Sequence, residues 1–471
     1  MPASINLITE ATPLLLQDAI IPFRTSVYLY SLIAAVGGFI CGFDTGSISS
    51  IISLPMFQSR FFINGSLAYY ESILLASYLV TSMCGAFFSG YFCDGIGRTY
   101  AMLLATCFLV LGGLGTGLMT NAIPLYQSEI APPDIRGRLI SIFALLGSFG
   151  QMVGYFVTFE SSYYTSHWSW RMPWLVQLIT CLLFAVAICF LPYSPRWLID
   201  KGREAEGLAV LSKLHHLPQQ HKVVQKDYLE IKTLIETEKL DGQDRTYAEL
   251  FQGSNLKRAL HAFFISVATC FTGNVVISYY APQIFKNAGF SDVSISLALT
   301  GGIGFLSLVF TALSLQWWID LWGRKALFLI GSTISAICMF TVGFIFYLYT
   351  CVAKDDTVIV ANPYARYVII LCIYVFSASF AGTWGVANYV YTAEIFSMRC
   401  RAKGLSLTYA ISWAGSIVIT YCTPFFMAYT ISGVYLFFGA CSVLTLVGVV
   451  LIPETKGKTL EEIDFMFNNH K

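Results

Sequence analysis

Asp44 is an ionisable residue inside a stretch that is otherwise suited to cross a membrane. It lies in the apolar run from 26 to 48, where no other residue carries a charge. An ionisable side chain in lipid is costly, and such a residue is a functional candidate by default. Asp44 is therefore the first residue for which the sequence suggests chemistry.

Charged residues also gather in clusters beside the apolar runs, and these clusters recur in the same order in the two halves of the chain. Charge-assisted pairs at helix ends can form in one state of a two-part molecule and break in another. We therefore predict a cytoplasmic gate, the alternative being charges that only fix the orientation of the spans. The gate residues are Asp94, Arg98, Glu129 and Arg136 in the first half and Asp320, Arg324, Glu394 and Arg401 in the second.

The composition indicates a chain that is embedded in a lipid bilayer. Of its 471 residues, 56% are hydrophobic and 12% charged, and the mean hydropathy is +0.66, which is more apolar surface than one soluble core buries. The apolar runs are continuous, so they predict helices rather than a barrel. We expect an all-α polytopic membrane protein with spans at 26–48, 72–92, an atypical 101–130, 139–159, 173–192, 259–282, 295–318, 326–350, 366–389, 404–427 and 432–452.

The distribution of Lys and Arg predicts the orientation of these spans, because basic residues collect in short cytoplasmic loops. It places both termini and the charged segment 199–258 in the cytoplasm, most simply at the plasma membrane. The loops near 50–68, 160–171, 283–293 and 351–365 then face outside, and Asn64 opens a candidate glycosylation triplet there. The expected domains are a tail (1–25), a bundle (26–198), a helical linker (199–258), a second bundle (259–452) and a tail (453–471).

Several classes of protein do not fit this sequence. A net charge of +1 argues against a nucleic-acid partner. The thirteen cysteines are odd in number, form no CxxC pair and mostly lie in apolar runs, so neither a disulfide framework nor a metal site is expected. Since no phosphate loop, nucleophile triad or zinc motif is present, we expect no enzyme, no cofactor and no metal.

The two halves repeat one another, but the repeat is incomplete at one place. From Asp320 to Glu394 is 74 residues, enough for two spans and a loop, whereas from Asp94 to Glu129 is only 35. One full span between two cytoplasmic clusters would invert everything downstream, and two full spans need about 40 residues before any turn. The first half is therefore about 39 residues short between its charged clusters.

Ten short motifs follow one another in the order found in the sugar porter branch of the major facilitator superfamily, which this chain resembles over nearly its whole length. The motifs are GFDTG (42–46), GYFCDGIGR (90–98), PLYQSEIAPPDIRGR (124–138), SWRMPW (169–174), SPRWL (194–198), TGNVVISYYAPQIF (272–285), DLWGRK (320–325), WGVANYVYTAEIF (384–396), RAKG (401–404) and PETKGKTLEE (453–462).

The resemblance implies a major facilitator fold of two pseudo-symmetric helical bundles. It also implies that a span, a loop and the start of the next span are missing between Cys107 and Gly115. We therefore expect spans 3 and 4 to be compressed into a shortened hairpin or a single broken helix at 99–124, with its backbone sheltered by protein. A natural deletion, an alternative transcript or an error in the gene model would each explain the gap.

The resemblance also suggests roles for individual residues. The counterpart of Asp44 in proton-coupled relatives is the proton-binding acid, but its arginine partner would lie in the missing segment. Amides and hydroxyls that bind ring hydroxyls, with an aromatic face for the sugar ring, would make the substrate site. The candidates are Gln151, Asn274, Ser278, Tyr279, Tyr280, Trp384, Asn388 and Tyr389.

Several amides of the family site are absent here, because the corresponding positions hold Ala144, Thr269, Cys270 and Val275. We therefore expect a transporter for a sugar or a related polyol, or a less hydroxylated solute, that works by alternating access as a monomer in the lipid bilayer. Protons are a candidate second substrate. The alternatives are a truncated relative that does not transport and a membrane sensor or receptor of sugars.

Overall fold

The computed structural model describes residues 14–62, 66–111, 113–132, 135–240, 247–290, 292–352, 358–396, 400–456 and 466–467. Asn64 lies outside them. Short helices and strands connect or extend the long helices. They are α2 (Pro55–Phe61), α8 (Pro195–Asp200), η1 (Tyr247–Phe251), η2 (Cys270–Asn274), η3 (Ser314–Trp318), α14 (Ile319–Leu321), β1 (Thr350–Val352) and β2 (Val358–Val360). The two strands pair antiparallel, with Thr350 opposite Val360.

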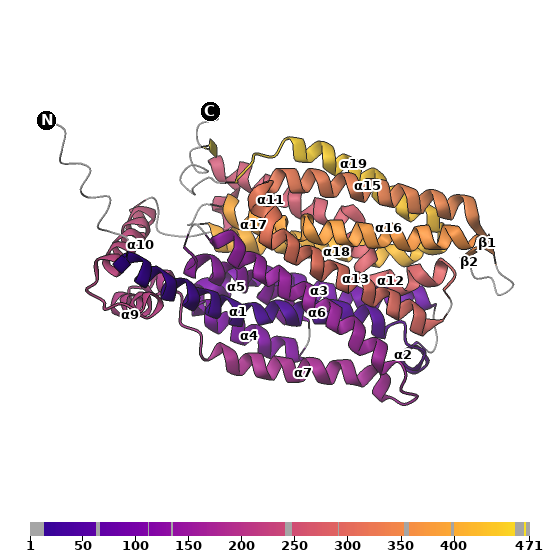
Figure 1. Cartoon of the computed structure of the whole chain (residues 1–471), viewed down its shortest axis with the longest axis horizontal. Coiled ribbons are helices and arrows are strands. Elements are labelled where there is room, and N and C mark those ends of the chain that lie inside the picture. Colours follow the sequence, from indigo (N-terminus) through magenta and orange to yellow (C-terminus); the bar gives the residue numbers. More distant parts are fainter. Residues whose placement is uncertain are drawn as a thin grey trace.

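The remaining helices form two bundles that lie side by side (Figure 1). The first bundle contains α1 (Leu14–Ile51), α3 (Leu67–Ile96), α4 (Arg98–Leu111), α5 (Leu114–Ile130), α6 (Arg136–Ser161) and α7 (Trp168–Ile188). The second contains α11 (Gly253–Thr269), α12 (Val275–Asn287), α13 (Val293–Leu313), α15 (Arg324–Tyr349), α16 (Pro363–Gly382), α17 (Trp384–Ile395), α18 (Arg401–Tyr429) and α19 (Ile431–Val450). Between the bundles in sequence lie α9 (Glu204–His215) and α10 (Lys222–Leu240).

Ten helical stretches of the described chain are long and apolar enough to cross a membrane. Each overlaps one of the predicted spans, with α11 to α12 and α16 to α17 each counted as one crossing. The predicted span 101–130 has no counterpart among these ten stretches, because α4 is apolar but too short to cross a membrane. The all-α membrane fold is confirmed.

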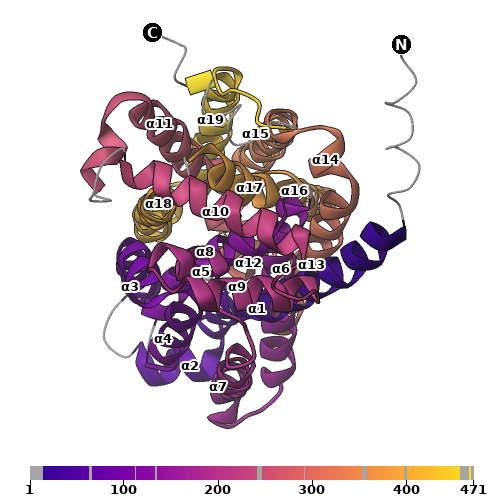
Figure 2. The same ribbon diagram turned by 90° about the vertical axis from the view of Figure 1, so that its left-hand side faces the viewer.

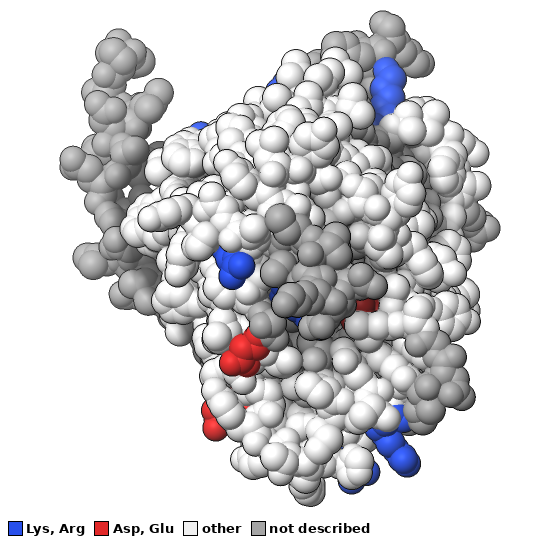
Figure 3. Space-filling view, turned by 90° about the vertical axis from the view of Figure 1, so that its right-hand side faces the viewer, with Lys and Arg blue, Asp and Glu red and all other residues white. Residues whose placement is uncertain are grey.

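The two ends of the molecule differ in character. Helices α8, α9 and α10 cover one end, which we call the linker end (Figure 2). The opposite end bears α2 and the β1–β2 pair, and we call it the far end. Only a few Lys, Arg, Asp and Glu side chains are visible on the far end (Figure 3).

The linker helices are fixed by capping and charge. Ser194 caps α8 by accepting a hydrogen bond from the Trp197 amide at 3.3 Å, and the Trp197 indole donates to the Asp94 carbonyl at 3.1 Å. Between α9 and α10, Glu204 accepts from the Tyr228 hydroxyl and from Lys232 Nζ, at 2.5 and 2.9 Å. These bonds to Glu204 raise the pKa of both Tyr228 and Lys232. Two helices thus pack against one another in the segment 199–258, where we expected a helical linker.

Glycines allow α1 and α6 to approach very closely. A Cβ at Gly42 would overlap the Gly147 carbonyl, and one at Gly46 would overlap that of Gln151. Small residues permit such contacts between membrane helices. The two glycines of the GFDTG motif therefore hold Asp44 and Thr45, which lie between them, at a fixed distance from α6.

Helices α4 and α5 form a hairpin that stops inside the bundle. They contain 14 and 17 residues, so they are about 21 and 26 Å long, less than the ~30 Å of a hydrocarbon layer. Near the tip, Gly115 of α5 lies directly against Ala105 and Leu109 of α4. Over this stretch the chain forms two short helices that pack against one another.

The tip of the hairpin is sheltered by α3. The Ser82 hydroxyl donates to the Gly113 carbonyl at 3.1 Å, and a Cβ at Gly117 would lie only 2.7 Å from the Ala86 amide nitrogen. Backbone groups without a partner are not tolerated in lipid. The contact with α3 therefore explains how a chain reversal is accommodated at this depth.

Candidate functional site

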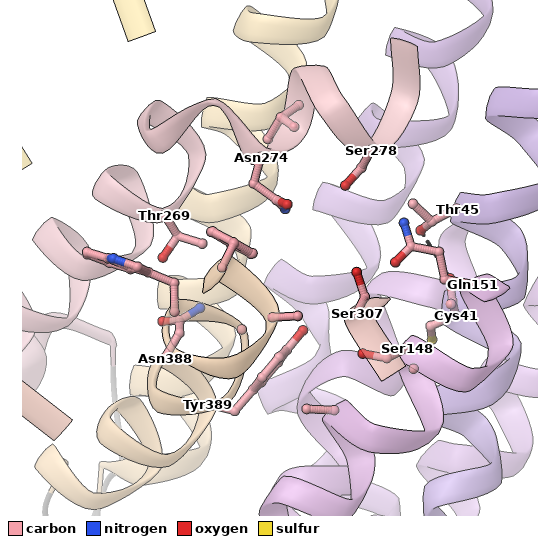
Figure 4. A pocket seen from close by; sticks show the side chains of 18 of the residues that line it. Cys41, Thr45, Ser148, Gln151, Thr269, Asn274, Ser278, Ser307, Asn388 and Tyr389 are labelled. Atoms are coloured by element: carbon pink, nitrogen blue, oxygen red, sulfur yellow. Dashed lines mark hydrogen bonds between the residues drawn. The ribbon is translucent and has the colours of Figure 1, made fainter. Parts of the chain in front are cut away.

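A cavity of about 280 Å³ lies between the two bundles. Figure 4 shows Thr45, Ser148 and Gln151 on its first-bundle side, facing Thr269, Asn274, Asn388 and Tyr389 of the second bundle. Its other polar lining residues are Thr116, Thr120, Ser278, Ser307, Thr311, Ser377, Ser412 and Ser416. Its aromatic lining residues are Phe143, Tyr279, Phe380, Trp384, Tyr389, Tyr409 and Trp413. Hydroxyls, amides and aromatic rings thus surround one space.

Hydrogen bonds join the bundles around this cavity. Gln151 Nε2 donates to the Tyr155 hydroxyl at 2.9 Å, and that hydroxyl donates to the Ser278 carbonyl at 3.0 Å. Nearby, the hydroxyls of Ser148 on α6 and Thr311 on α13 lie 3.1 Å apart. The cavity is therefore shaped by both halves, as a site between two moving bundles requires.

Two amides of the second bundle are free to bind a ligand. No hydrogen bond of the Asn274 side chain is found within the described part of the chain, and this side chain points into the cavity. Asn388 is buried, and its Oδ1 has no partner among the described residues. Each offers an amide group that a hydroxylated ligand can satisfy.

Seven of the eight substrate-site candidates line this cavity, namely Gln151, Asn274, Ser278, Tyr279, Trp384, Asn388 and Tyr389. Tyr280 is not among the residues that line it. It is buried, and its hydroxyl donates to the Thr420 carbonyl at 2.7 Å. Tyr280 (φ −116°) breaks the regular turn of α12 two residues before Pro282, which directs the neighbouring Tyr279 to the cavity instead.

Trp384 lines the cavity but is completely buried within the protein. Its indole nitrogen donates to the Ser332 hydroxyl at 3.2 Å, and its ring packs 4.5 Å from that of Phe328. The indole N–H of Trp384 is therefore already hydrogen-bonded, and Trp384 contributes only the surface of its ring to the cavity wall.

Sequence reasoning missed many hydroxyl residues of the cavity. Thr45 is adjacent to Asp44, and Thr116 and Thr120 lie one helical turn apart on α5. Serine and threonine are common in membrane helices, where they bond to their own backbone. Only the three-dimensional position distinguishes those that line a cavity.

Asp44 does not line the central cavity. Its carboxylate accepts from the Thr116 hydroxyl at 3.1 Å and from Gln177 Nε2 of α7. Within the described part of the chain it forms no ion pair. The donors to Asp44 in these two hydrogen bonds are both neutral. Gln177 could have been noticed as an amide in the apolar run 173–192.

The charged clusters form two equivalent sites at the linker end. In the first bundle, Arg98 Nη2 lies 2.7 Å from Glu129 and 3.5 Å from Asp94, and Arg98 Nη1 donates to the Cys93 carbonyl. In the second bundle, Arg324 Nη2 lies 2.7 Å from Glu394. Arg324 Nη1 donates to the carbonyl five residues earlier, as Arg98 does.

Glycine makes these two turns possible. Gly97 (φ 90°) and Gly323 (φ 87°) precede the two arginines and adopt the left-handed region that other residues avoid. The D-x-x-G-R motif is thus a tight turn that returns the arginine to its own helix end.

The ion pairs of Arg98 and Arg324 described above each join residues of the same bundle. They therefore do not themselves connect the two bundles. Arg324 nevertheless borders the first bundle, because a Cβ at Gly137 would lie 3.3 Å from its Nη2. Arg401 is engaged by other groups. The side chains of Arg136 and Asp320 lie outside the described residues.

Asn121 and Tyr247 make polar contacts that reach across the two bundles at the linker end. Asn121 Nδ2 lies 3.4 Å from the Ala402 carbonyl. Tyr247 bonds both bundles, donating to the Phe87 carbonyl at 2.9 Å and lying 3.1 Å from the Ser406 hydroxyl. These contacts hold the two bundles together at the linker end.

Two helical bundles around a central polar cavity, with paired charged turns at one end, define a membrane transporter of the two-bundle type. Comparison with known proteins gives the same result. The family described as "Sugar (and other) transporter" matches residues 30–114 and 109–467, and the chain belongs to this family. The two matched segments meet at 109–114, which is the tip of the α4–α5 hairpin.

Individual relatives support this assignment. A protein named probable quinate permease from Aspergillus niger is 29% identical over 94% of this chain and 88% of its own length. The major facilitator-type transporter ecdD of Aspergillus rugulosus is also 29% identical, over 93% of this chain and 87% of its own length.

Solved structures share the fold. The proton:xylose symporter XylE bound to 6-bromo-6-deoxy-D-glucose aligns with a TM-score of 0.80 at 25% identity, over 94% of this chain and 99% of that one. An inward open conformation of the E. coli xylose transporter XylE aligns less well, with a TM-score of 0.72 at 25% identity. The alignment covers 93% of this chain and 99% of that one.

Proposed function

We propose that this protein transports a neutral sugar or polyol across a membrane by alternating access. The observation that carries the proposal is the central cavity, in which hydroxyls and two available amides from both bundles surround a space lined by aromatic rings. Amides bind sugar hydroxyls as donors and as acceptors. Aromatic faces cover the apolar side of a sugar ring.

The charge of the cavity bears on the substrate. Several similar proteins are named quinate permeases, and quinate is a carboxylate. No Lys, Arg or His is among the described residues that line the central cavity. A buried carboxylate requires a partner, so an uncharged polyol fits this cavity better than an acid.

Asp44 is proposed as the proton-binding group. It is a buried acid held by Thr116, which also lines the central cavity. A change in the protonation of Asp44 would therefore alter the hydrogen bond of Thr116, which lies in the wall of the substrate cavity. A relative of similar fold is a proton:xylose symporter, and this supports the same coupling here.

We propose that the linker end faces the cytoplasm, that the protein acts as a monomer, and that it lies in the plasma membrane. The linker end carries the basic turns of Arg98 and Arg324. The contacts between the bundles at that end support a state in which substrate does not reach the cytoplasm. The eight gate residues would then act by stabilising each bundle's cytoplasmic end, with Arg324 against Gly137 as the contact that changes.

Uptake into proteoliposomes tests the choice of substrate. The purified chain would be given labelled D-glucose, D-xylose, myo-inositol and quinate at one pH. We expect saturable uptake of at least one neutral compound and much weaker uptake of quinate. Preferred uptake of quinate would contradict the neutral-substrate proposal, since the cavity offers no cation.

A further inference from the structure

A second cavity, of about 590 Å³, lies in the first bundle beyond the tip of the α4–α5 hairpin. It is lined by residues of α1, α2, α3, α4 and α7, and by Gly113 beside the tip. Because α4 and α5 are too short to fill the bundle, the space that two full spans would occupy is open. The cavity follows from the shortened hairpin.

Most of the walls of this second cavity are apolar. They include Ile48, Ile52, Leu74 and Leu109. Its rim includes Val110, Trp174 and Leu178, which are 47%, 39% and 39% exposed on a surface that faces lipid. Apolar cavities do not hold water well and bind apolar ligands. A hydrocarbon group can therefore enter this cavity from the membrane.

One end of the cavity is polar. Asp44 and Gln177 both line it, and the Gln177 amide nitrogen donates to Asp44. Gln177 is only 7% exposed, and its Oε1 has no hydrogen-bond partner among the described residues. A buried acceptor of this kind is costly to leave unsatisfied. Two acceptors, one of them a carboxylate, thus lie at the end of an apolar cavity and lack a cationic donor.

We propose that this cavity binds a hydrophobic amine. The ammonium group would donate to Asp44 and to Gln177 Oε1, and the alkyl body would lie along the apolar walls. No Lys, Arg or His is among the described lining residues, so no cationic side chain of the cavity pairs with the carboxylate, whose donors Gln177 and Thr116 are neutral. A hydrophobic alcohol offers one neutral donor, and a fatty acid adds a second negative charge, so both match the site less well.

This site is separate from the central cavity, and a hydrogen bond links a wall residue of one to a wall residue of the other. Asp44 lines only the second cavity, whereas Thr116, which donates to Asp44 at 3.1 Å, lines the central one. The proposal needs only the second cavity and its two acceptors. It can therefore hold or fail independently of the identity of the transported solute.

Trp174 lies in the wall and serves as a reporter. The full chain in phosphatidylcholine nanodiscs would be titrated with 11-bromoundecylamine, whose bromine quenches indole fluorescence on contact. The difference between the chain and its Trp174→Phe variant isolates the signal of this residue. We expect saturable quenching by the amine and about tenfold weaker quenching by the matched bromo-alcohol and bromo-acid, because a hydrogen bond to a charged group favours the amine.

Variants locate the head group and the tail. Asp44→Asn and, separately, Gln177→Leu should reduce amine affinity to that of the alcohol. Thr81→Phe should lower quenching by all probes, because Thr81 lines the cavity. The matched Thr333→Phe should not, since Thr333 is an exposed residue of α15 that bonds only within its own helix.

Three results would overturn the proposal. Equal quenching by amine, alcohol and acid at equal membrane concentration would mean that lipid chains merely fill the space. Quenching that does not saturate would mean that no site exists. Unchanged amine affinity in folded Gln177→Leu and Asp44→Asn would mean that the polar end binds nothing.

Discussion

Arg98 and Glu129 lie 31 residues apart in the chain, yet Arg98 Nη2 is 2.7 Å from the Glu129 carboxylate. Their counterparts Arg324 and Glu394 are 70 residues apart and are also joined at 2.7 Å. The same turn is thus closed by a chain that is 39 residues shorter in the first bundle. The α4–α5 connection begins and ends at the linker end, so the spans that follow it keep the same orientation in the membrane as in the second bundle.

Removal of Arg98 should destabilise the first bundle. The Arg98 and Glu129 side chains are 8% and 5% exposed, and a buried pair that loses one partner costs about 3–5 kcal/mol. We expect Arg98→Met to lose that amount in unfolding free energy and Arg98→Met with Glu129→Met to recover part of it. The measurement is the folded fraction after heating in detergent, followed by size exclusion.

The exposed pair of Arg203 and Glu206 is the control for this experiment. Its side chains are 45% and 55% exposed, and solvent-exposed ion pairs contribute little to stability. Arg203→Met should therefore change the folded fraction little. Equal losses in Arg98→Met and Arg203→Met would show that the buried pair does not hold the hairpin.

The contact between α5 and α3 should tolerate no side chain at Gly117. A Cβ there would lie 2.7 Å from the Ala86 amide nitrogen and still closer to the Ser82 carbonyl. Both neighbours are helix backbone, so the helices would have to separate, at a cost of about 1–3 kcal/mol. Gly117→Ala should lower the melting temperature.

Gly95→Ala provides a matched control in α3. A Cβ at Gly95 meets nothing within 4 Å, and alanine favours a helix by about 0.5–1 kcal/mol over glycine. It should therefore leave the melting temperature unchanged or raise it. A stable Gly117→Ala protein would mean that the hairpin is not packed as described.

Asn274 and Tyr280 should respond differently to substitution. Asn274 lines the central cavity, so Asn274→Ala should weaken substrate binding about 2- to 10-fold, the effect of one hydrogen bond. Tyr280 lies outside the cavity and bonds to the Thr420 carbonyl. Tyr280→Phe should leave the KM of uptake unchanged and affect only stability.

The comparison of the two KM values for uptake checks this assignment. A larger KM change in Tyr280→Phe than in Asn274→Ala would place the substrate elsewhere than in the central cavity.

The sequence predicted the membrane fold, the duplication and the position of the shortened stretch because each depends on patterns along the chain. Apolar runs, D-x-x-G-R turns and the distance from Asp94 to Glu129 can all be measured without a structure. Which charged groups pair could be suggested in the same way, and the pair of Arg98 with Glu129 was within the predicted cluster.

Contacts that depend on helix rotation could not be predicted. Tyr279 and Tyr280 are neighbours, and only the break in α12 near Pro282 decides which one lines the cavity. Gln177 was overlooked because its partner Asp44 lies 133 residues earlier in the chain. The second cavity depends on how α2, α3 and α7 surround a gap, and no local pattern in the sequence specifies that.

Asp44→Asn should separate transport from the proton gradient. An acidic exterior should increase uptake by the native chain if Asp44 carries the proton inward, and the variant should show no such increase. The Thr116 and Gln177 donors remain, so the variant is expected to fold. Uptake of labelled substrate with and without an imposed pH gradient measures the effect. Native uptake that is independent of the gradient would indicate facilitated diffusion instead.

The central claim is that a bundle with a shortened hairpin still alternates between its two states. Counterflow tests this directly, because it needs the cavity to open to each side in turn and needs no driving gradient. Proteoliposomes containing the folded chain and loaded with unlabelled neutral polyol should transiently accumulate the labelled compound. Absence of counterflow for every neutral sugar and polyol tested would contradict the account and would indicate a relative that does not transport.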